Sequence, residues 1–151
     1  MNYFGDPSTK LCVKTCPNLT EIVNGASVTV YTYADYSTRL CVRKCNETDG
    51  LHGTFGDNFT NTCVQRCPGG SFGDPLTVNR HCVATCTGGN FADPLSMQCV
   101  SRCPASPPYF GYEGNWTCLK ACPTGFWADS TTRKCVDTCP PNHFRLTSFR
   151  R

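Results

Sequence analysis

The apolar residues of this chain recur in a fixed pattern and form no long run. An aromatic residue stands eight positions before the first cysteine of a Cys-x3-Cys pair in six of seven segments, and ten positions before it in the fourth, which has two extra residues. The seven aromatic residues are Phe4, Tyr33, Phe55, Phe72, Phe91, Phe110 and Trp127. Gly or Ala follows each of them, and Asp comes next in every segment except the sixth, which has Tyr112. This periodicity predicts a tandem array of one small unit.

Each unit contains one large apolar side chain, which is surrounded by turn-forming residues. We expect the aromatic ring to pack on a disulfide and on the neighbouring unit, and the small residue beside it to let two backbones approach closely. The Asp carboxylate can accept hydrogen bonds from backbone N–H groups two residues further on, which is typical of turns. An extended Cys-x3-Cys segment would place both sulfurs on one face. The pattern therefore predicts two-stranded β-fingers with strands of about two to four residues and little or no helix.

The interval between the first two cysteine pairs, residues 17–40, is long enough for an additional element. Val28, Val30, Tyr31 and Tyr33 follow the turn-forming pair Asn24-Gly25, which predicts a longer hairpin arm. No interval is rich enough in Gly and Ser to form a flexible linker. We therefore expect residues 1–151 to form one continuous cysteine-rich array with a small, disulfide-rich, extended fold.

The composition indicates that disulfides take the place of a large hydrophobic core. Fourteen of the 151 residues are cysteines, and all fourteen belong to the seven pairs. This density is typical of a disulfide scaffold in an oxidising compartment, so we expect an extracellular or cell-surface location. No apolar run could span a membrane, and no signal-type apolar segment follows Met1. Because the repeated sequence is already under way at residue 2, we expect this chain to be a segment of a longer secreted protein.

The net charge of +3 is too small to indicate nucleic acid binding, and the Lys and Arg residues are scattered beside the cysteines. Zinc sites usually use Cys-x2-Cys spacing, whereas the spacing here is x3 throughout and the three histidines occupy unrelated positions. One Asp per repeat supplies too few oxygens for calcium, so a turn-capping role is favoured. Neither a redox Cys-x-x-Cys motif nor an acid/base arrangement is present. We therefore expect no cofactor, no metal, no catalytic residue and no enzymatic activity.

The cysteine pairing is left open by the residues themselves. One scheme joins the two cysteines of each pair, which closes a small ring and leaves the long segments unconstrained. The other scheme joins the second cysteine of one pair to the first of the next, and each such loop contributes about 3 kcal/mol on the chain-entropy model.

The phrases TCVQRCP and HCVATC, with an aromatic residue and an Asp between successive pairs, resemble the furin-like cysteine-rich repeats of growth-factor receptors. Runs such as YADYSTRLCVRKC look still closer to repeats in secreted and surface proteins of ciliates. The resemblance covers nearly the whole chain. Unlike the receptors, however, this chain lacks two-disulfide modules. In receptor modules with one disulfide, the second cysteine of a pair bonds to the first of the next.

The resemblance therefore implies a disulfide ladder. Its rungs would be Cys16–Cys41, Cys45–Cys63, Cys67–Cys82, Cys86–Cys99, Cys103–Cys118 and Cys122–Cys135. This ladder leaves one cysteine at each end, Cys12 and Cys139, for an inter-segment or intermolecular disulfide.

Four N-glycosylation sequons are present, all of them with Thr and none with Pro at the middle position. Their asparagines are Asn18, Asn46, Asn58 and Asn115. In a chain expected to enter the secretory route, these sequons predict N-linked glycans, which would shield a thin molecule from proteolysis and lateral aggregation.

Together these observations predict a structural component of an extracellular glycosylated fibre, surface coat or appendage, which acts as a disulfide-laddered rod. Its partners would be its own kind, through self-association or continuation into further repeats. The alternative is a receptor or adhesion ectodomain that binds a protein or glycan, with its site in the irregular segment 17–40.

Overall fold

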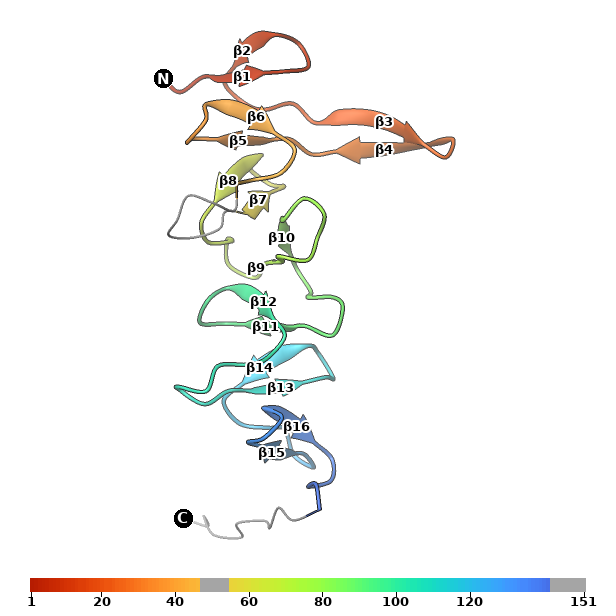
Figure 1. Ribbon diagram of the computed structural model, residues 1–151, viewed down its shortest axis with the longest axis vertical. Coiled ribbons are helices and arrows are strands. Elements are labelled where there is room, and N and C mark those ends of the chain that lie inside the picture. Colours follow the sequence, from red (N-terminus) through yellow and green to blue (C-terminus); the bar gives the residue numbers. More distant parts are fainter. Residues whose placement is uncertain (47–54, 142–151) are drawn as a thin grey trace. The chain divides into compact units, whose positions relative to one another are not determined.

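The computed structural model describes residues 1–46 and 55–141, which contain sixteen short strands and no helix (Figure 1). Contacts divide the chain into two compact units. The first unit comprises residues 1–84 and 96–98, and the second comprises residues 85–95 and the described residues from 99 onward. The repeat runs through both units. The prediction of a small, disulfide-rich array of β-fingers is confirmed.

Fourteen of the strands form seven pairs that carry the repeat. We call each pair a finger and number the fingers 1 to 7 in chain order. Their strands are β1 (Phe4–Asp6) and β2 (Leu11–Val13), β5 (Tyr33–Asp35) and β6 (Leu40–Val42), β7 (Phe55–Asp57) and β8 (Thr62–Val64), β9 (Phe72–Gly73) and β10 (Cys82–Val83), β11 (Phe91–Asp93) and β12 (Gln98–Val100), β13 (Phe110–Tyr112) and β14 (Thr117–Leu119), and β15 (Trp127–Asp129) and β16 (Lys134–Val136). Fingers 1 to 4, 6 and 7 are antiparallel hairpins in which Gly or Ala stands opposite the first cysteine of the pair.

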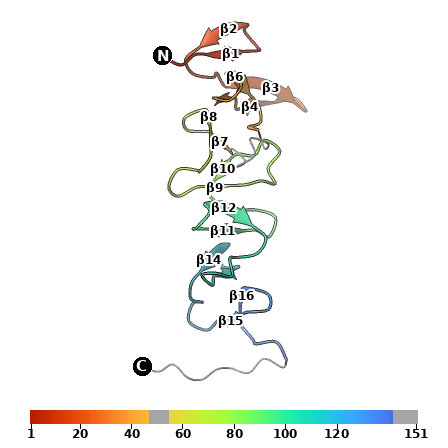
Figure 2. The same ribbon diagram turned by 60° about the vertical axis from the view of Figure 1, so that its left-hand side comes forward.

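The hairpin arm predicted between the first two pairs is present. Strands β3 (Leu19–Val23) and β4 (Ala26–Val30) pair in antiparallel fashion along their whole length. Asn24 and Gly25 join them with φ angles of 51° and 79°, which a type I′ turn requires. The arm extends sideways from its neighbours β5 and β6 in the first unit, as the view in Figure 2 also shows.

The repeated Asp closes the turn of its finger. All six of these carboxylates accept a hydrogen bond from the backbone N–H two residues further on, at 2.9–3.0 Å. In finger 2, for example, Asp35 accepts from the Ser37 N–H and hydroxyl and from the Thr38 hydroxyl. The expected turn-capping geometry is therefore confirmed.

One residue in each turn is left-handed, which the sequence pattern did not indicate. It stands two positions before the first cysteine of the pair and has a φ angle between 47° and 63°. These residues are Lys10, Arg39, Asn61, Arg80, Met97, Trp116 and Arg133. Only Asn is commonly found in this conformation among these side chains, so the turn imposes it. The consequence is that the carbonyl of this residue points out of its own finger.

Successive fingers are connected through that carbonyl, in an arrangement that we call the joint. The backbone N–H of the small residue after the aromatic donates to it, at 2.7–2.8 Å, and one parallel β-bridge forms beside the bond. The six donor and acceptor pairs are Gly5 and Arg39, Ala34 and Asn61, Gly56 and Arg80, Gly73 and Met97, Ala92 and Trp116, and Gly111 and Arg133. Each pair lies within one of the two compact units.

The aromatic ring of one finger fills the space against the small residue of the next. Phe4 is buried against Ala34 and the cysteines Cys16 and Cys41. At three other joints the small residue is Gly, and a Cβ added to Gly56 would overlap the Tyr33 ring. The rings of Phe55 and Phe91 approach Gly73 and Gly111 in the same way. The expectation that the aromatic residue packs on a disulfide and on the neighbouring unit is confirmed.

The expectation of a fully extended Cys-x3-Cys segment is wrong. In finger 1 the strand ends at Val13, directly after the first cysteine, and Lys14 and Thr15 form a bend before Cys16. The same bend follows Val42 and Val64 in the next two fingers. It turns the second cysteine out of its own hairpin, which is necessary because this cysteine bonds to the following finger.

The close approach at the joint gives a testable prediction. Gly56→Ala should lower local stability by about 1–3 kcal/mol, because the new methyl group would overlap the Tyr33 ring and force it to move. Amide hydrogen exchange followed by mass spectrometry should show faster exchange in residues 55–64. Gly69→Ala is the control, because a Cβ there meets no atom within 4 Å. Unchanged protection in Gly56→Ala would contradict this account of the joint.

Candidate functional site

Six disulfides connect the fingers, and they join the same cysteines as the ladder that the resemblance implies. Their Cα–Cα distances are 5.5–5.7 Å, and the sequence separations range from 13 to 25 residues. Each bond runs from the bend after one finger to the second strand of the next. Every rung therefore fixes the same two fingers that one joint connects.

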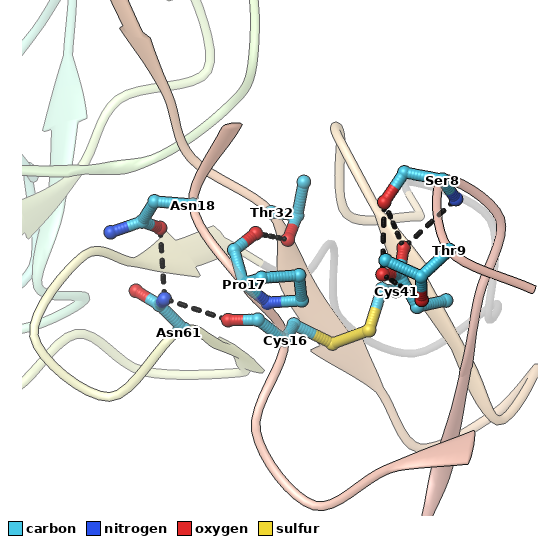
Figure 3. The surroundings of a disulfide bond; sticks show 9 residues. Ser8, Thr9, Cys16, Pro17, Asn18, Thr32, Cys41 and Asn61 are labelled. Atoms are coloured by element: carbon cyan, nitrogen blue, oxygen red, sulfur yellow. Dashed lines mark hydrogen bonds between the residues drawn. A yellow bond between two sulfur atoms is a disulfide. The ribbon is translucent and has the colours of Figure 1, made fainter. Parts of the chain in front are cut away.

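Polar side chains hold the chain in place around the rung Cys16–Cys41, as Figure 3 shows. The Asn61 side-chain amide donates to the Cys16 carbonyl at 3.0 Å and to Asn18 Oδ1 at 2.8 Å. The Thr32 hydroxyl donates to the Pro17 carbonyl at 2.6 Å. These bonds fix the segment that leads from the disulfide into the arm, so the arm has a defined base.

The four sequons lie at separate places and do not form a common site. Asn18, Asn46 and Asn115 are exposed, and Asn58 is half-buried. The Thr48 of the second sequon lies outside the described residues. No two of the asparagines share a finger turn, so glycans on them would be distributed along the array.

In three sequons the oxygen of the asparagine amide accepts a hydrogen bond. Asn18 Oδ1 accepts from Asn61, and its nitrogen points away from that residue in Figure 3. Asn115 Oδ1 accepts from the hydroxyl of Thr117, the third residue of its own sequon. Asn58 Oδ1 accepts from the Tyr33 hydroxyl at 2.6 Å. These bonds use the oxygen and leave the amide nitrogen, the atom to which an N-linked glycan attaches.

Tyr33 is held both by packing and by a hydrogen bond. Its ring is buried against Gly56, and its hydroxyl reaches the sequon asparagine Asn58. Burial raises the pKa of Tyr33 to about 12, with smaller contributions from Tyr31 and from the Asp57 carboxylate. The hydroxyl therefore keeps its proton and serves as a permanent donor to Asn58.

Cys12 and Cys139 are the two cysteines without a disulfide. Cys12 is exposed and Cys139 is half-buried. The equivalent cysteines of fingers 2 to 7 all bond to the preceding finger, and they are buried in fingers 2, 5, 6 and 7 and half-buried in fingers 3 and 4. The two thiols lie in the first and the last finger of the described array.

The pKa shifts of two repeated Asp residues follow from the hydrogen bonds in their turns. The pKa of Asp6 is lowered by hydrogen bonds from the Ser8 hydroxyl, the Thr9 hydroxyl and the Ser8 N–H. For Asp35, burial alone would raise the pKa, but the hydrogen bonds from Ser37 and Thr38 outweigh it and the pKa is lowered. Both carboxylates therefore direct their oxygens to their own turns. Across the described residues, no three His, Cys, Asp or Glu side chains are grouped closely enough to hold a metal ion.

Open clefts lie beside finger 1 and beside finger 6. One, of about 250 Å³, is lined by the finger 1 turn and by Leu19, Thr32 and Arg43 at the base of the arm. The other, of about 290 Å³, lies beside Tyr112, the residue that replaces the repeated Asp. There the Tyr112 and Phe126 rings meet edge to face at 5.1 Å, and Lys134 pairs with Glu113 at 2.9 Å.

The described residues contain no helix long and apolar enough to cross a membrane. Comparisons with protein-family models, with curated proteins and with solved structures found no match for this chain. The resemblance to furin-like and ciliate cysteine-rich repeats therefore stays a prediction that rests on the cysteine phrases, and function must be inferred from the joints, the rungs and the exposed groups themselves.

Proposed function

We propose that this chain is a structural component of an extracellular glycosylated fibre, surface coat or appendage, in which it acts as a disulfide-laddered rod. The observation that carries the proposal is the repetition of one joint, which combines a disulfide, a backbone hydrogen bond and a buried ring between successive fingers. Repeated units that contact only their neighbours form quasi-one-dimensional proteins. The disulfide content also suits an oxidising extracellular compartment.

The connectivity of the ladder suits a mechanical role. The shortest covalent path along the chain crosses each disulfide and then the three residues of a Cys-x3-Cys segment. It bypasses every loop between rungs, such as residues 17–40 and 104–117. The aromatic residues and Asp turns of fingers 2 to 7 all lie in these bypassed loops. Tension therefore acts on covalent bonds, and opening a finger would not lengthen the chain.

The proposed mechanical role predicts a specific response to force. When the chain is stretched from its two ends with the disulfides intact, fingers 2 to 7 should give no lengthening steps. After reduction, six loops of 13 to 25 residues should become extensible, each adding roughly 3.3–3.6 Å per residue. Single-molecule force spectroscopy measures both states. Stepwise lengthening by these loops before reduction would refute the mechanism.

The location of the protein in its source material is the direct test of the function. Antibodies against the chain, visualised with gold particles in electron microscopy, should label filaments or a continuous coat outside the cell. Treatment with a thiol reductant should weaken these structures, because the rungs would open. Labelling of discrete, dispersed molecules that bind a ligand saturably would reject the structural role.

Glycosylation is the second part of the proposal, and the exposed sequons support it. On expression through a eukaryotic secretory pathway, the protein should lose mass when treated with peptide N-glycosidase. Asn18→Gln and Asn115→Gln should each remove one glycan, because both asparagines are exposed and both accept their hydrogen bond through the amide oxygen. Asn2→Gln, an exposed asparagine outside any sequon, is the control. Intact-mass spectrometry measures the number of glycans on each variant. If both sequon variants carried as many glycans as the unsubstituted protein, the prediction would be wrong.

A second candidate function, adhesion or reception, is favoured by the arm. Its tip carries exposed apolar side chains on both faces, with Ile22 72% exposed on one face and Val23, 48% exposed, on the same face as Val28 on the other. Exposed apolar groups gathered in one place are typical of protein-binding surfaces. Under this alternative the fingers would serve as a scaffold for the arm, and the microscopy experiment above separates it from a fibre.

A further inference from the structure

The turn of finger 6 departs from the repeat at its first and fourth positions, and the two changes complement each other. Tyr112 stands where the other fingers have Asp. Asn115, the asparagine of a sequon, stands where four fingers have a Thr. We propose that the first N-acetylglucosamine of a glycan on Asn115 packs on the Tyr112 ring, in the cleft between fingers 6 and 7. This inference deepens the proposed glycosylation and rests on it.

The first and fourth side chains of a finger turn lie next to each other. In fingers 1, 2, 3 and 7 the hydroxyl of the fourth residue, Thr, donates to the carboxylate of the first, Asp, at 2.6–2.8 Å. The strands of finger 6 pair in the same register as those of finger 1, and Trp116 has the left-handed φ angle of the other turns. The side chain of Asn115 therefore leaves the backbone on the side of the turn where Tyr112 begins.

The amide of Asn115 is accessible and partly fixed in direction. The residue is exposed, and its Oδ1 accepts a hydrogen bond from the Thr117 hydroxyl. An N-linked glycan is attached through the amide nitrogen, so this bond can persist after glycosylation. It limits rotation of the Asn115 side chain, and with it the directions in which the first sugar can extend.

The cleft of about 290 Å³ begins directly beside Asn115. Residues 112–114 line it from finger 6, and Phe126 and Lys134 line it from finger 7. Both fingers belong to the second compact unit and are connected by a joint. A sugar on Asn115 therefore has an open cleft within reach, between two parts of the chain that hold each other in place.

Two contacts hold the Tyr112 ring in this cleft. A Cβ added to Gly114 would overlap the ring, so the ring lies directly over this residue. Phe126 meets the ring edge to face, with 5.1 Å between the ring centres. Both rings are half-buried, so part of each remains accessible. Because the aromatic surface is formed in advance, little side-chain ordering opposes the packing of a sugar on it.

The equivalent cleft at another joint has a polar lining. Between fingers 1 and 2, the cleft of about 250 Å³ has Asp6 and Thr32 at the positions of Tyr112 and Phe126. The aromatic lining thus occurs at the joint whose turn carries a sequon asparagine at its fourth position. The two rings and Asn115 are placed as a set for one ligand.

The chemistry of N-acetylglucosamine fits this lining. The faces of its pyranose ring carry C–H groups, and its acetamide ends in a methyl group. Packing these groups on an aromatic ring removes apolar surface from water. Its hydroxyls extend outward from the ring edge, where Glu113 and Lys134 form a partly exposed ion pair at 2.9 Å. The carboxylate can accept hydrogen bonds from hydroxyls, and the ammonium group can donate to them.

An attached sugar is favoured over a free one as the occupant. A volume of about 290 Å³ lies just below the roughly 300–1,000 Å³ of most small-molecule sites, and the cleft is open. A free sugar would have to bind there through its own affinity. A sugar held on Asn115 is already at a high effective concentration, so a weak contact is sufficient to keep it in place.

The first test measures what the glycan does to its turn. The protein is produced through a secretory pathway that adds high-mannose glycans, and Asn115→Gln is the unglycosylated reference. Amide hydrogen exchange in residues 110–119 should be about fivefold slower with the glycan, which corresponds to ~1 kcal/mol and to the contribution of one aromatic contact. Equal exchange rates in the two proteins would overturn the proposal.

A matched pair of variants tests the ring. Tyr112→Asp restores the residue of the repeat and removes the ring, whereas Tyr112→Phe retains a ring. Each is compared with its own double variant that also carries Asn115→Gln, so effects of the substitution on the turn itself cancel. The slowing by the glycan should persist in Tyr112→Phe and disappear in Tyr112→Asp. Undiminished slowing in Tyr112→Asp would rule out the ring contact.

Trimming the glycan identifies the sugar that makes the contact. An endoglycosidase that leaves only the first N-acetylglucosamine should preserve the slowing, because the outer sugars lie beyond the cleft. Loss of the slowing on this treatment would assign the effect to the outer sugars and reject the proposed packing.

Peptide mapping by mass spectrometry separates this proposal from glycosylation itself. A glycan on Asn115 that leaves exchange unchanged would overturn the packing and leave the proposed glycosylation standing. An Asn115 without a glycan would overturn the packing as well, whereas a glycan found on Asn18 would still support glycosylation of the chain. Intact mass confirms that all six disulfides form in every variant.

Discussion

The structure depends on a single constraint, which is that the aromatic ring of one finger must reach the backbone of the next. A ring can lie against a strand only where the facing residue is small, and at Gly56 even a methyl group would overlap the ring. The same close approach brings the small residue's N–H within 2.7–2.8 Å of a carbonyl on the neighbouring finger. The left-handed residue supplies that carbonyl. The bend after the first cysteine of a pair places the second cysteine where it can bond to the next finger.

This arrangement explains how a chain with no long apolar run stays folded. Each buried cluster is small, such as Phe4 with Ala34, Cys16 and Cys41. Such a cluster would be marginal alone, but the disulfide beside it limits the freedom of the unfolded loop, and the Asp of the adjacent turn satisfies backbone N–H groups without a longer ladder. Short-range order therefore takes the place of a central core.

The features that depend on side-chain chemistry could be predicted from the sequence, and those that depend on backbone direction could not. Asp6 before Ser8 indicated its turn, and Asn24-Gly25 indicated the arm, because those side chains have strong local preferences. The left-handed position carries Lys, Arg, Asn, Met or Trp, so its residue types gave no signal. The bend inside Cys-x3-Cys could not be predicted either, because the residues that form it have no shared turn preference. The spacing of the sequons was evident, but the Tyr33 bond to Asn58 joins residues far apart in the chain.

The fourth finger has a consequence for how such a protein can change over generations. Its turn contains two additional residues, yet Gly73 still donates to Met97 and the Cys67–Cys82 bond still forms. The groups that join one finger to the next are mostly backbone atoms and sulfurs, which every unit possesses irrespective of its other residues. Duplication or loss of a whole repeat would therefore preserve these connections and alter the reach of the protein, provided that each aromatic ring still faces a residue as small as its position requires.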